Sequence, residues 1–156
     1  MVSLKKEVES VVEILRGRSQ AEIDTILEQV KQKFSRRGFP ISIVNAKVTV
    51  LQAVVKYLRE NKEYSFKEIA EILGRNEKNI WIAYDTAKKK MPVRFEIVSD
   101  EVYIPFEVFR SNYSPLESVV VYLKKKMSLH EIGQLLERDD RTIWTVYNRA
   151  MKKDEK

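Results

Sequence analysis

The chain has 156 residues, of which 44% are apolar, and a formal net charge of +6. This apolar content is enough for a packed core and too high for a disordered chain. No apolar run approaches the roughly 18 residues of a membrane span, so no membrane association is expected. Cysteine is absent, which excludes disulfides and thiolate chemistry and fits a reducing cytoplasm. The net positive charge favours a polyanionic partner.

Residues 1–38 have the apolar spacing of two amphipathic helices. The apolar residues of the first helix are Leu4, Val8, Val11 and Leu15. Ser19 and Glu22 form a capping-box pattern at the start of the second helix. We predict a helical hairpin that serves for packing or for homodimer formation. Glu9–Leu15 also resembles Glu117–Leu123, so a decayed copy of the repeat described next is the alternative.

The rest of the chain contains a tandem repeat. SFKEIAEILGRNEKNIWIAYDTAKKK (65–90) aligns with SLHEIGQLLERDDRTIWTVYNRAMKK (128–153), with 11 identities in 26 positions. Upstream, an offset of 65 residues aligns Pro40 with Pro105 and continues the repeat. Each unit is therefore predicted as a short apolar strand, a loop and three helices. The predicted domains are 1–38, 39–92 and 93–156, and such small units are expected to need mutual packing.

Two further strands are predicted between the repeats, within Val93–Phe109 and on either side of Ser99–Glu101. Pro105 indicates an edge strand or the end of a strand. Ile41–Val44 is a candidate third strand. The predicted fold class is thus mainly α with a small β-hairpin, built from two tandem helix-turn-helix units and an N-terminal helical hairpin.

The second and third helices of each unit have the signals of a helix-turn-helix. Capping boxes begin the second helices, and Asn76 and Asp139 are the predicted N-caps of the third helices. Ala70 and Gly133 occupy the position where the helices approach closely. The predicted inward side chains of the third helices are Ile80, Tyr84 and Ala87, and then Ile143, Tyr147 and Ala150.

The opposite faces of the third helices are predicted to contact DNA. The candidate residues are Lys78, Asn79, Ile82, Asp85, Thr86, Lys88 and Lys89 in the first unit, and Arg141, Thr142, Thr145, Asn148 and Arg149 in the second. Ser65, Ser128 and His130 join them at the starts of the second helices. Arg pairs with guanine, Asn pairs with adenine, and Thr contacts the thymine methyl group. Because only the second unit presents all three types, we expect it to contribute more base discrimination. For Trp81 and Trp144, which lie beside these faces, packing is the favoured prediction, and contacts with the DNA backbone or with a second copy of the chain are the alternatives.

The pattern S-x-x-E-I-A-x-x-L-G-R at Ser65–Arg75, its match at Ser128–Arg138 and the following I-x-x-x-Y-x-x-A spacing resemble sigma factor region four. Arg138–Ala150 is also similar to a module of archaeal and phage-type DNA-binding proteins. The resemblance covers about 100 residues. It implies major-groove binding to double-stranded DNA and a role in transcription, with the outward third-helix residues as base contacts.

No glycine-rich phosphate-binding motif and no metal-ligand spacing appears, so no enzyme, cofactor or metal site is expected. We predict a sequence-specific transcriptional regulator that binds a direct or asymmetric DNA site, with half-sites roughly 34 Å apart. The alternatives are an adaptor that recruits basal transcription machinery, a DNA-packaging or recombination accessory subunit, and a purely structural helical array.

Overall fold

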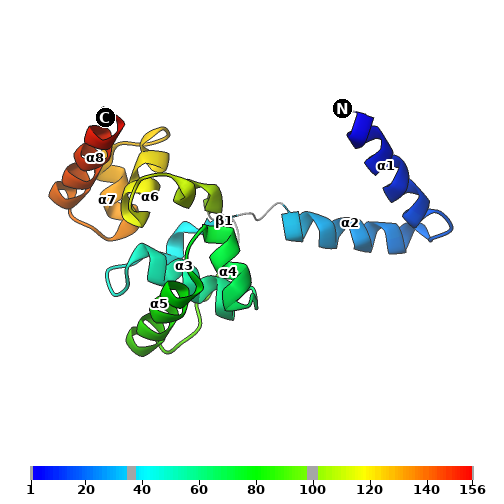
Figure 1. Cartoon of the computed structure of the whole chain (residues 1–156), viewed down its shortest axis with the longest axis horizontal. Coiled ribbons are helices and arrows are strands. Elements are labelled where there is room, and N and C mark those ends of the chain that lie inside the picture. The colour runs from blue at the N-terminus through cyan, green and yellow to red at the C-terminus, as the bar shows by residue number, and fades with distance from the viewer. Residues whose placement is uncertain (1, 35–37, 98–101, 156) are drawn as a thin grey trace. The chain divides into compact units, whose positions relative to one another are not determined.

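The computed structural model describes residues 2–34, 38–97 and 102–155, and the chain divides into two compact units, 1–37 and 38–156 (Figure 1). The predicted fold class is confirmed, because the structure is mainly helical with one small antiparallel sheet of two strands.

The N-terminal unit consists of helices α1 (Val2–Leu15) and α2 (Gln20–Phe34). Gly17 allows the turn between them, with a positive φ of 85°. The predicted capping box begins α2, since the Ser19 N–H donates to the Glu22 carboxylate at 2.8 Å and the Glu22 N–H donates to Ser19 Oγ at 3.3 Å. Both predicted helices therefore form.

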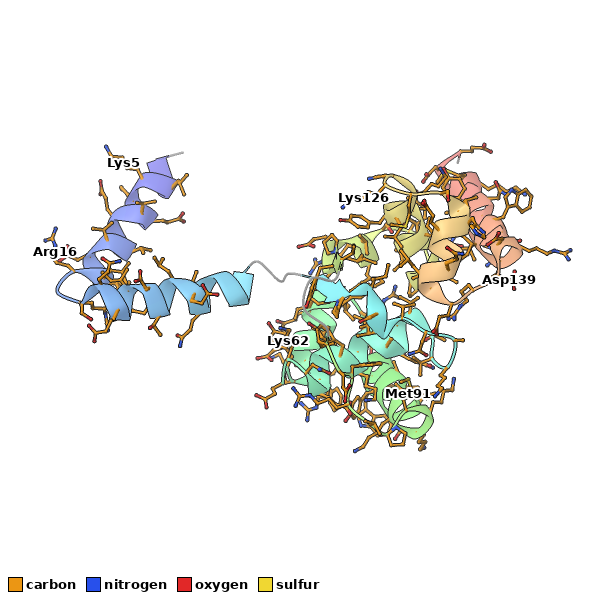
Figure 2. All side chains as sticks on the ribbon, turned by 180° about the vertical axis from the view of Figure 1, so that it is seen from behind. Lys5, Arg16, Lys62, Met91, Lys126 and Asp139 are labelled. Atoms are coloured by element: carbon orange, nitrogen blue, oxygen red, sulfur yellow. The ribbon has the colours of Figure 1, made fainter. Side chains whose placement is uncertain are left out.

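These two helices do not bury their apolar faces on each other. Leu4, Val8 and Val11 are 63%, 53% and 52% exposed. Leu15, Ile23 and Ile26 are half-buried. Figure 1 shows α1 and α2 diverging from the turn that joins them, and the described side chains of both helices appear as sticks in Figure 2. The predicted helical hairpin is therefore present, with much of the apolar face of α1 exposed. Its role in packing or homodimer formation stays a prediction.

The second unit contains both repeats, and their elements follow the same order. The first repeat comprises β1 (Gly38–Pro40), the 3-10 helix η1 (Ile41–Ile43), α3 (Val50–Glu60), α4 (Phe66–Leu73) and α5 (Glu77–Lys90). The second comprises β2 (Tyr103–Pro105), η2 (Phe106–Arg110), α6 (Pro115–Lys124), α7 (Leu129–Leu136) and α8 (Asp140–Asp154). Capping boxes at Thr49 and Ser114 also begin α3 and α6. The T-x-x-Q and S-x-x-E patterns there are the signal that sequence reasoning missed.

The helix-turn-helix geometry is present in both repeats. A left-handed residue ends the second helix in each case, Gly74 at φ 64° and Glu137 at φ 54°. Asn76 and Asp139 cap the third helices, as predicted. A Cβ atom added to Gly133 would lie 2.9 Å from the Arg138 carbonyl oxygen. The predicted close approach of the two helices at this position is therefore confirmed.

The strand pairing differs from the predicted hairpin. β1 pairs with β2, and Phe39 faces Ile104 in the antiparallel register. Val93–Ile97 is not a strand. Two of its carbonyl groups accept hydrogen bonds from α3 and its C-cap: Lys56 Nζ donates to Val93 O at 2.8 Å, and Asn61 Nδ2 donates to Phe95 O at 3.0 Å. The candidate third strand at Ile41–Val44 is instead the 3-10 helix η1. The predicted turn at Ser99–Glu101 lies outside the described residues.

An approximate twofold axis relates the two repeats. Phe39 and Ile104 are equivalent in the alignment and face each other, and Gly38 pairs with Pro105 as Pro40 pairs with Tyr103. If every residue is replaced by its equivalent in the other repeat, the same three residue pairs result. The packing is reciprocal as well, since η1 contacts α7, η2 contacts α4, and α3 contacts its own equivalent, α6. The axis therefore passes between Phe39 and Ile104.

We call the segments 38–43 and 103–110 the arms of the two repeats. Each arm packs against the other repeat's second helix. Arg110 Nη2, at the end of one arm, donates to the Glu71 carbonyl of α4 at 2.7 Å. Following the other arm, the Asn45 carbonyl accepts from Arg138 Nη1 at 2.8 Å. The exchange of arms joins the two repeats through one continuous core.

A buried carboxylate ties α8 to α6 in the second repeat. Glu117 is 1% exposed and accepts hydrogen bonds from Lys153 Nζ at 2.7 Å and from the Ser114 N–H at 2.9 Å. The equivalent pair in the first repeat is Gln52 and Lys90, at 3.5 Å. Burial raises the pKa of Glu117, but the hydrogen bonds outweigh burial, so the pKa lies below its ordinary value of 4.5.

We expect Glu117→Gln to lower the free energy of unfolding at pH 7 by about 1–3 kcal/mol, because Lys153 loses its charged acceptor. In the native chain the lowered pKa means that the folded state binds this proton less tightly than the unfolded state. Its contribution to stability is therefore complete above pH 4.5 and is lost as the pH falls through the lowered folded pKa. Thermal unfolding at a series of pH values should show a weaker acid dependence in Glu117→Gln. Glu107→Gln, at an exposed position of η2, is the control, and an equal change there would contradict the prediction.

Candidate nucleic-acid interface

The third helices α5 and α8 are held by a buried face and leave the opposite face exposed. Ile80 and Ala87, and likewise Ile143 and Ala150, are fully buried. Tyr84 and Tyr147 are only half-buried, although they are predicted to face inward. The core also includes Ala83 and Val146, at 7% exposure each, which the predicted pattern missed. Each of the two helices carries four basic and two acidic side chains.

In the first repeat, the exposed candidates are Lys78, Asn79, Ile82, Lys88 and Lys89, while Asp85 and Thr86 are half-buried. The Asp85 carboxylate pairs with Lys89 Nζ at 2.9 Å. The ion pair compensates the negative charge that would otherwise repel phosphate groups.

In the second repeat, Arg141, Thr145 and Arg149 are exposed. The Thr145 hydroxyl donates to the Arg141 carbonyl at 2.9 Å, so its proton is engaged within the helix. Thr142 is half-buried, and its hydroxyl donates to the capping Asp139 carboxylate at 3.0 Å. Thr142 thus belongs to the helix cap, which limits it as a DNA contact.

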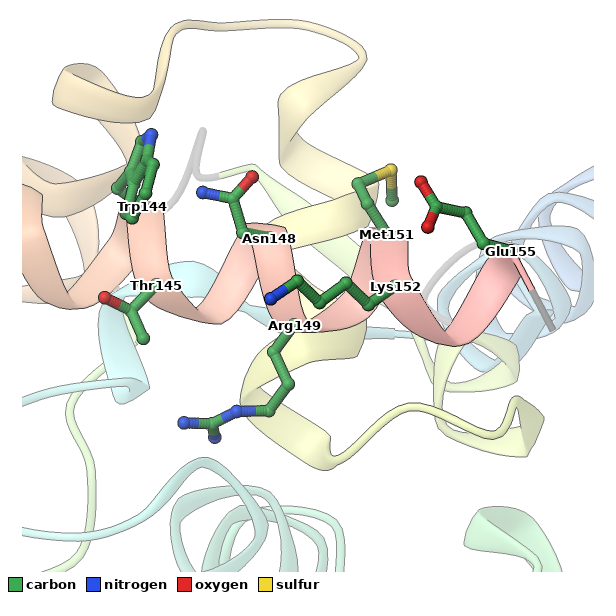
Figure 3. Close-up of a pocket in the computed structure, with 7 residues that line it drawn as sticks. All are labelled: Trp144, Thr145, Asn148, Arg149, Met151, Lys152 and Glu155. Carbon is green, nitrogen blue, oxygen red and sulfur yellow. The ribbon is translucent and has the colours of Figure 1, made fainter.

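Asn148 is only partly outward. The residue is half-buried, and its Nδ2 atom is buried without a hydrogen-bond partner. Six side chains of α8 and that of its C-cap residue line an open groove: Trp144, Thr145, Asn148, Arg149, Met151, Lys152 and Glu155. Figure 3 shows Trp144 and Asn148 projecting on one side of the helix and Arg149 on the other. An unpaired amide donor therefore lies beside this groove.

The packing predicted for Trp81 and Trp144 is not found within the described residues of the second unit, 38–97 and 102–155. The two tryptophans are 52% and 60% exposed. The two residues are equivalent in the repeats, and each adjoins a predicted base contact, Ile82 or Thr145. Each candidate surface thus presents a large aromatic ring among polar and charged groups.

At the starts of the second helices, Ser65 Oγ accepts from the Glu68 N–H at 3.1 Å and Ser128 Oγ accepts from the Glu131 N–H at 3.2 Å. The predicted capping boxes are therefore confirmed. The hydrogen bonds from Ser128 lower the pKa of Glu131. His130 Nδ1 lies 2.7 Å from an Asp140 carboxylate oxygen, which links the starts of α7 and α8. Contacts of Ser65, Ser128 and His130 with DNA stay predictions.

No group of acidic, histidine or cysteine side chains suited to hold a metal ion occurs among the described residues. None of the helices in the described segments has the length and apolar content needed to cross a bilayer. Comparisons of the chain with protein-family models, with curated proteins and with solved structures find no match.

Proposed function

We propose that residues 38–156 bind double-stranded DNA sequence-specifically, with α5 and α8 in the major groove, and that the chain regulates transcription. The observation that carries the proposal is the pair of helix-turn-helix units, each with an exposed third helix. A helix of this kind enters the major groove with its N-terminal residues at base edges. In this proposal the chain acts by binding and not as an enzyme.

The side chains on the two helices support the proposal. Arg141 is exposed near the start of α8 and suits guanine, and the unpaired Nδ2 of Asn148 suits adenine after a rotation of its side chain. Lys78 and Asn79 lie near the start of α5. Lys88, near the end of α5, is exposed and suits a phosphate group.

The test is DNA binding by the full chain as a function of salt concentration. A duplex selected from a random-sequence library should bind more tightly than unselected duplexes, and its affinity should fall steeply with salt. Lys88→Gln should reduce the log–log salt slope by about 0.9 if Lys88 contacts one phosphate. Lys125→Gln, at the C-cap of α6, should leave the slope unchanged. Absence of binding, or a complex insensitive to salt, would contradict the proposal.

A second candidate function is that of an adaptor that recruits transcription machinery, and the exposed Trp81 and Trp144 favour it. Tryptophan is enriched among the residues that dominate protein–protein binding energy. For an adaptor, Trp81→Ala/Trp144→Ala should abolish recruitment of RNA polymerase and leave DNA affinity unchanged. For a DNA-binding protein, loss of these rings from the groove-facing helices should weaken DNA binding itself.

A further inference from the structure

We infer that a single chain recognises an inverted, imperfect DNA repeat: two half-sites in opposite orientations, each with its own sequence. This inference rests on the proposed function and specifies its partner. It replaces the direct or asymmetric arrangement expected from a tandem repeat.

The orientation follows from the strand pair. Phe39 faces Ile104, its own equivalent, in an antiparallel register. An antiparallel pairing centred on equivalent residues relates the two repeats by a twofold rotation. To bind a direct DNA repeat in the same way, the two repeats would have to be related by a translation along the duplex axis. In helix-turn-helix dimers, the palindromy of the operator mirrors the twofold symmetry of the protein. The same geometry is present here within one chain.

The packing reinforces the rotation. Each arm contacts the other repeat's second helix, and α3 contacts α6 across the axis. The hydrogen bonds of Arg110 with α4 and of Arg138 with the Asn45 carbonyl fix both contacts. The rotational relation between α5 and α8 is therefore built into the shared core.

The placement of the third helices allows both to reach one duplex. Figure 1 shows α5 and α8 at separate ends of the 38–156 unit, both on the side away from the strand pair. On both helices the outward residues Lys78 and Arg141 are exposed. If both helices contact one duplex that crosses the twofold axis, the two half-sites run in opposite directions.

The half-sites differ because the equivalent outward residues differ. Lys78 corresponds to Arg141, Ile82 to Thr145, and Asp85 to Asn148. The negative Asp85 is paired with Lys89, whereas Asn148 has an unpaired donor. The adenine contact suited to Asn148 is not available at the equivalent position of the first repeat, which is Asp85. The DNA site is thus an imperfect palindrome, and the chain binds it in one direction only.

The first experiment uses the duplex that the full chain selects from a random-sequence library. One half-site is then reversed in place, which converts an inverted repeat into a direct one with unchanged half-site sequences. We expect reversal to weaken binding at least about tenfold, since it removes the base contacts of one helix. Equal affinity for both orientations would overturn the inference while leaving the proposed function intact. Failure to select any duplex would overturn the proposed function itself.

The second experiment makes the two recognition surfaces alike. The variant Lys78→Arg/Ile82→Thr/Asp85→Asn gives α5 three of the outward residues of α8. The half-site bound by the second repeat is identified first, as the half-site at which the Arg141→Ala variant shows a weaker base preference than the native chain. The triple variant should then gain at least about tenfold in affinity for a perfect palindrome of that half-site, relative to the native chain. No gain, with the helical content unchanged by circular dichroism, would overturn the assignment of different half-sites to the two helices.

Discussion

Replacing Phe39 with alanine is expected to lower the free energy of unfolding by about 3–5 kcal/mol and to destabilise both repeats together. Phe39 is fully buried, and its ring centroid lies 5.6 Å from that of Phe109 and 6.0 Å from that of Phe106, both in the other repeat's arm. Removal of the ring leaves a cavity at the twofold axis, where the two repeats share their core. A loss of this size is a large fraction of the roughly 5–15 kcal/mol that stabilises a typical protein.

Urea denaturation followed by circular dichroism would measure the loss, and amide hydrogen exchange would show how it is distributed. We expect exchange in α5 and α8 to accelerate by the same factor, because both depend on the shared core. Val93→Ala, at a position that is 77% exposed, should change stability by less than about 0.5 kcal/mol. Protection that persists in α8 while α5 exchanges freely would show that the repeats unfold independently.

Arg141→Ala is expected to weaken binding to the selected duplex about 5-fold to 150-fold, which corresponds to the roughly 1–3 kcal/mol of one bidentate base contact. The loss should be much smaller on unselected DNA, where the contact is with phosphate groups alone. Arg141→Lys should not restore the native preference, because an ammonium group lacks the planar pair of donors. Fluorescence anisotropy at fixed salt concentration would measure both affinities.

The matched variant in the first repeat is Lys78→Ala, which is expected to relax base preference less than Arg141→Ala does. Lys125→Ala, away from the third helices, is the control for loss of one positive charge. If Lys78→Ala abolished specificity while Arg141→Ala retained it, the first repeat would be the principal source of base discrimination.

The local elements of this fold could be predicted because their signals lie within a few residues of each other. Ser65 and Glu68 form a capping box in the sequence and in the structure, and Gly133 marks a close helix contact in both. The pairing of β1 with β2 could not be predicted in this way, because its partners are separated by the three helices of the first repeat. The apolar residues on either side of Ser99–Glu101 instead favoured a hairpin that included Val93–Ile97. Two carbonyl groups of that segment accept hydrogen bonds from Lys56 and Asn61.

Predicted and observed surfaces differ for a related reason. A period of 100° per residue places a side chain on a face of the helix but does not fix its rotamer or its neighbours. Arg141 is exposed as predicted, whereas the hydroxyl of Thr142 belongs to the Asp139 cap and the amide nitrogen of Asn148 is buried. The packing prediction for Trp81 and Trp144 rested on the average burial of tryptophan, whereas both side chains are more than half exposed.

The exchange of arms has a consequence for how the paired surface assembles. Helix-turn-helix proteins that form twofold pairs from separate chains lose the pair on dilution, since their association depends on protein concentration. Here both partners belong to one chain, and Phe39 meets Ile104 at any concentration. Because both repeats belong to one chain, a substitution can alter one repeat and leave the other unchanged, as the difference between Asp85 and Asn148 illustrates. In a homodimer the same substitution appears in both subunits.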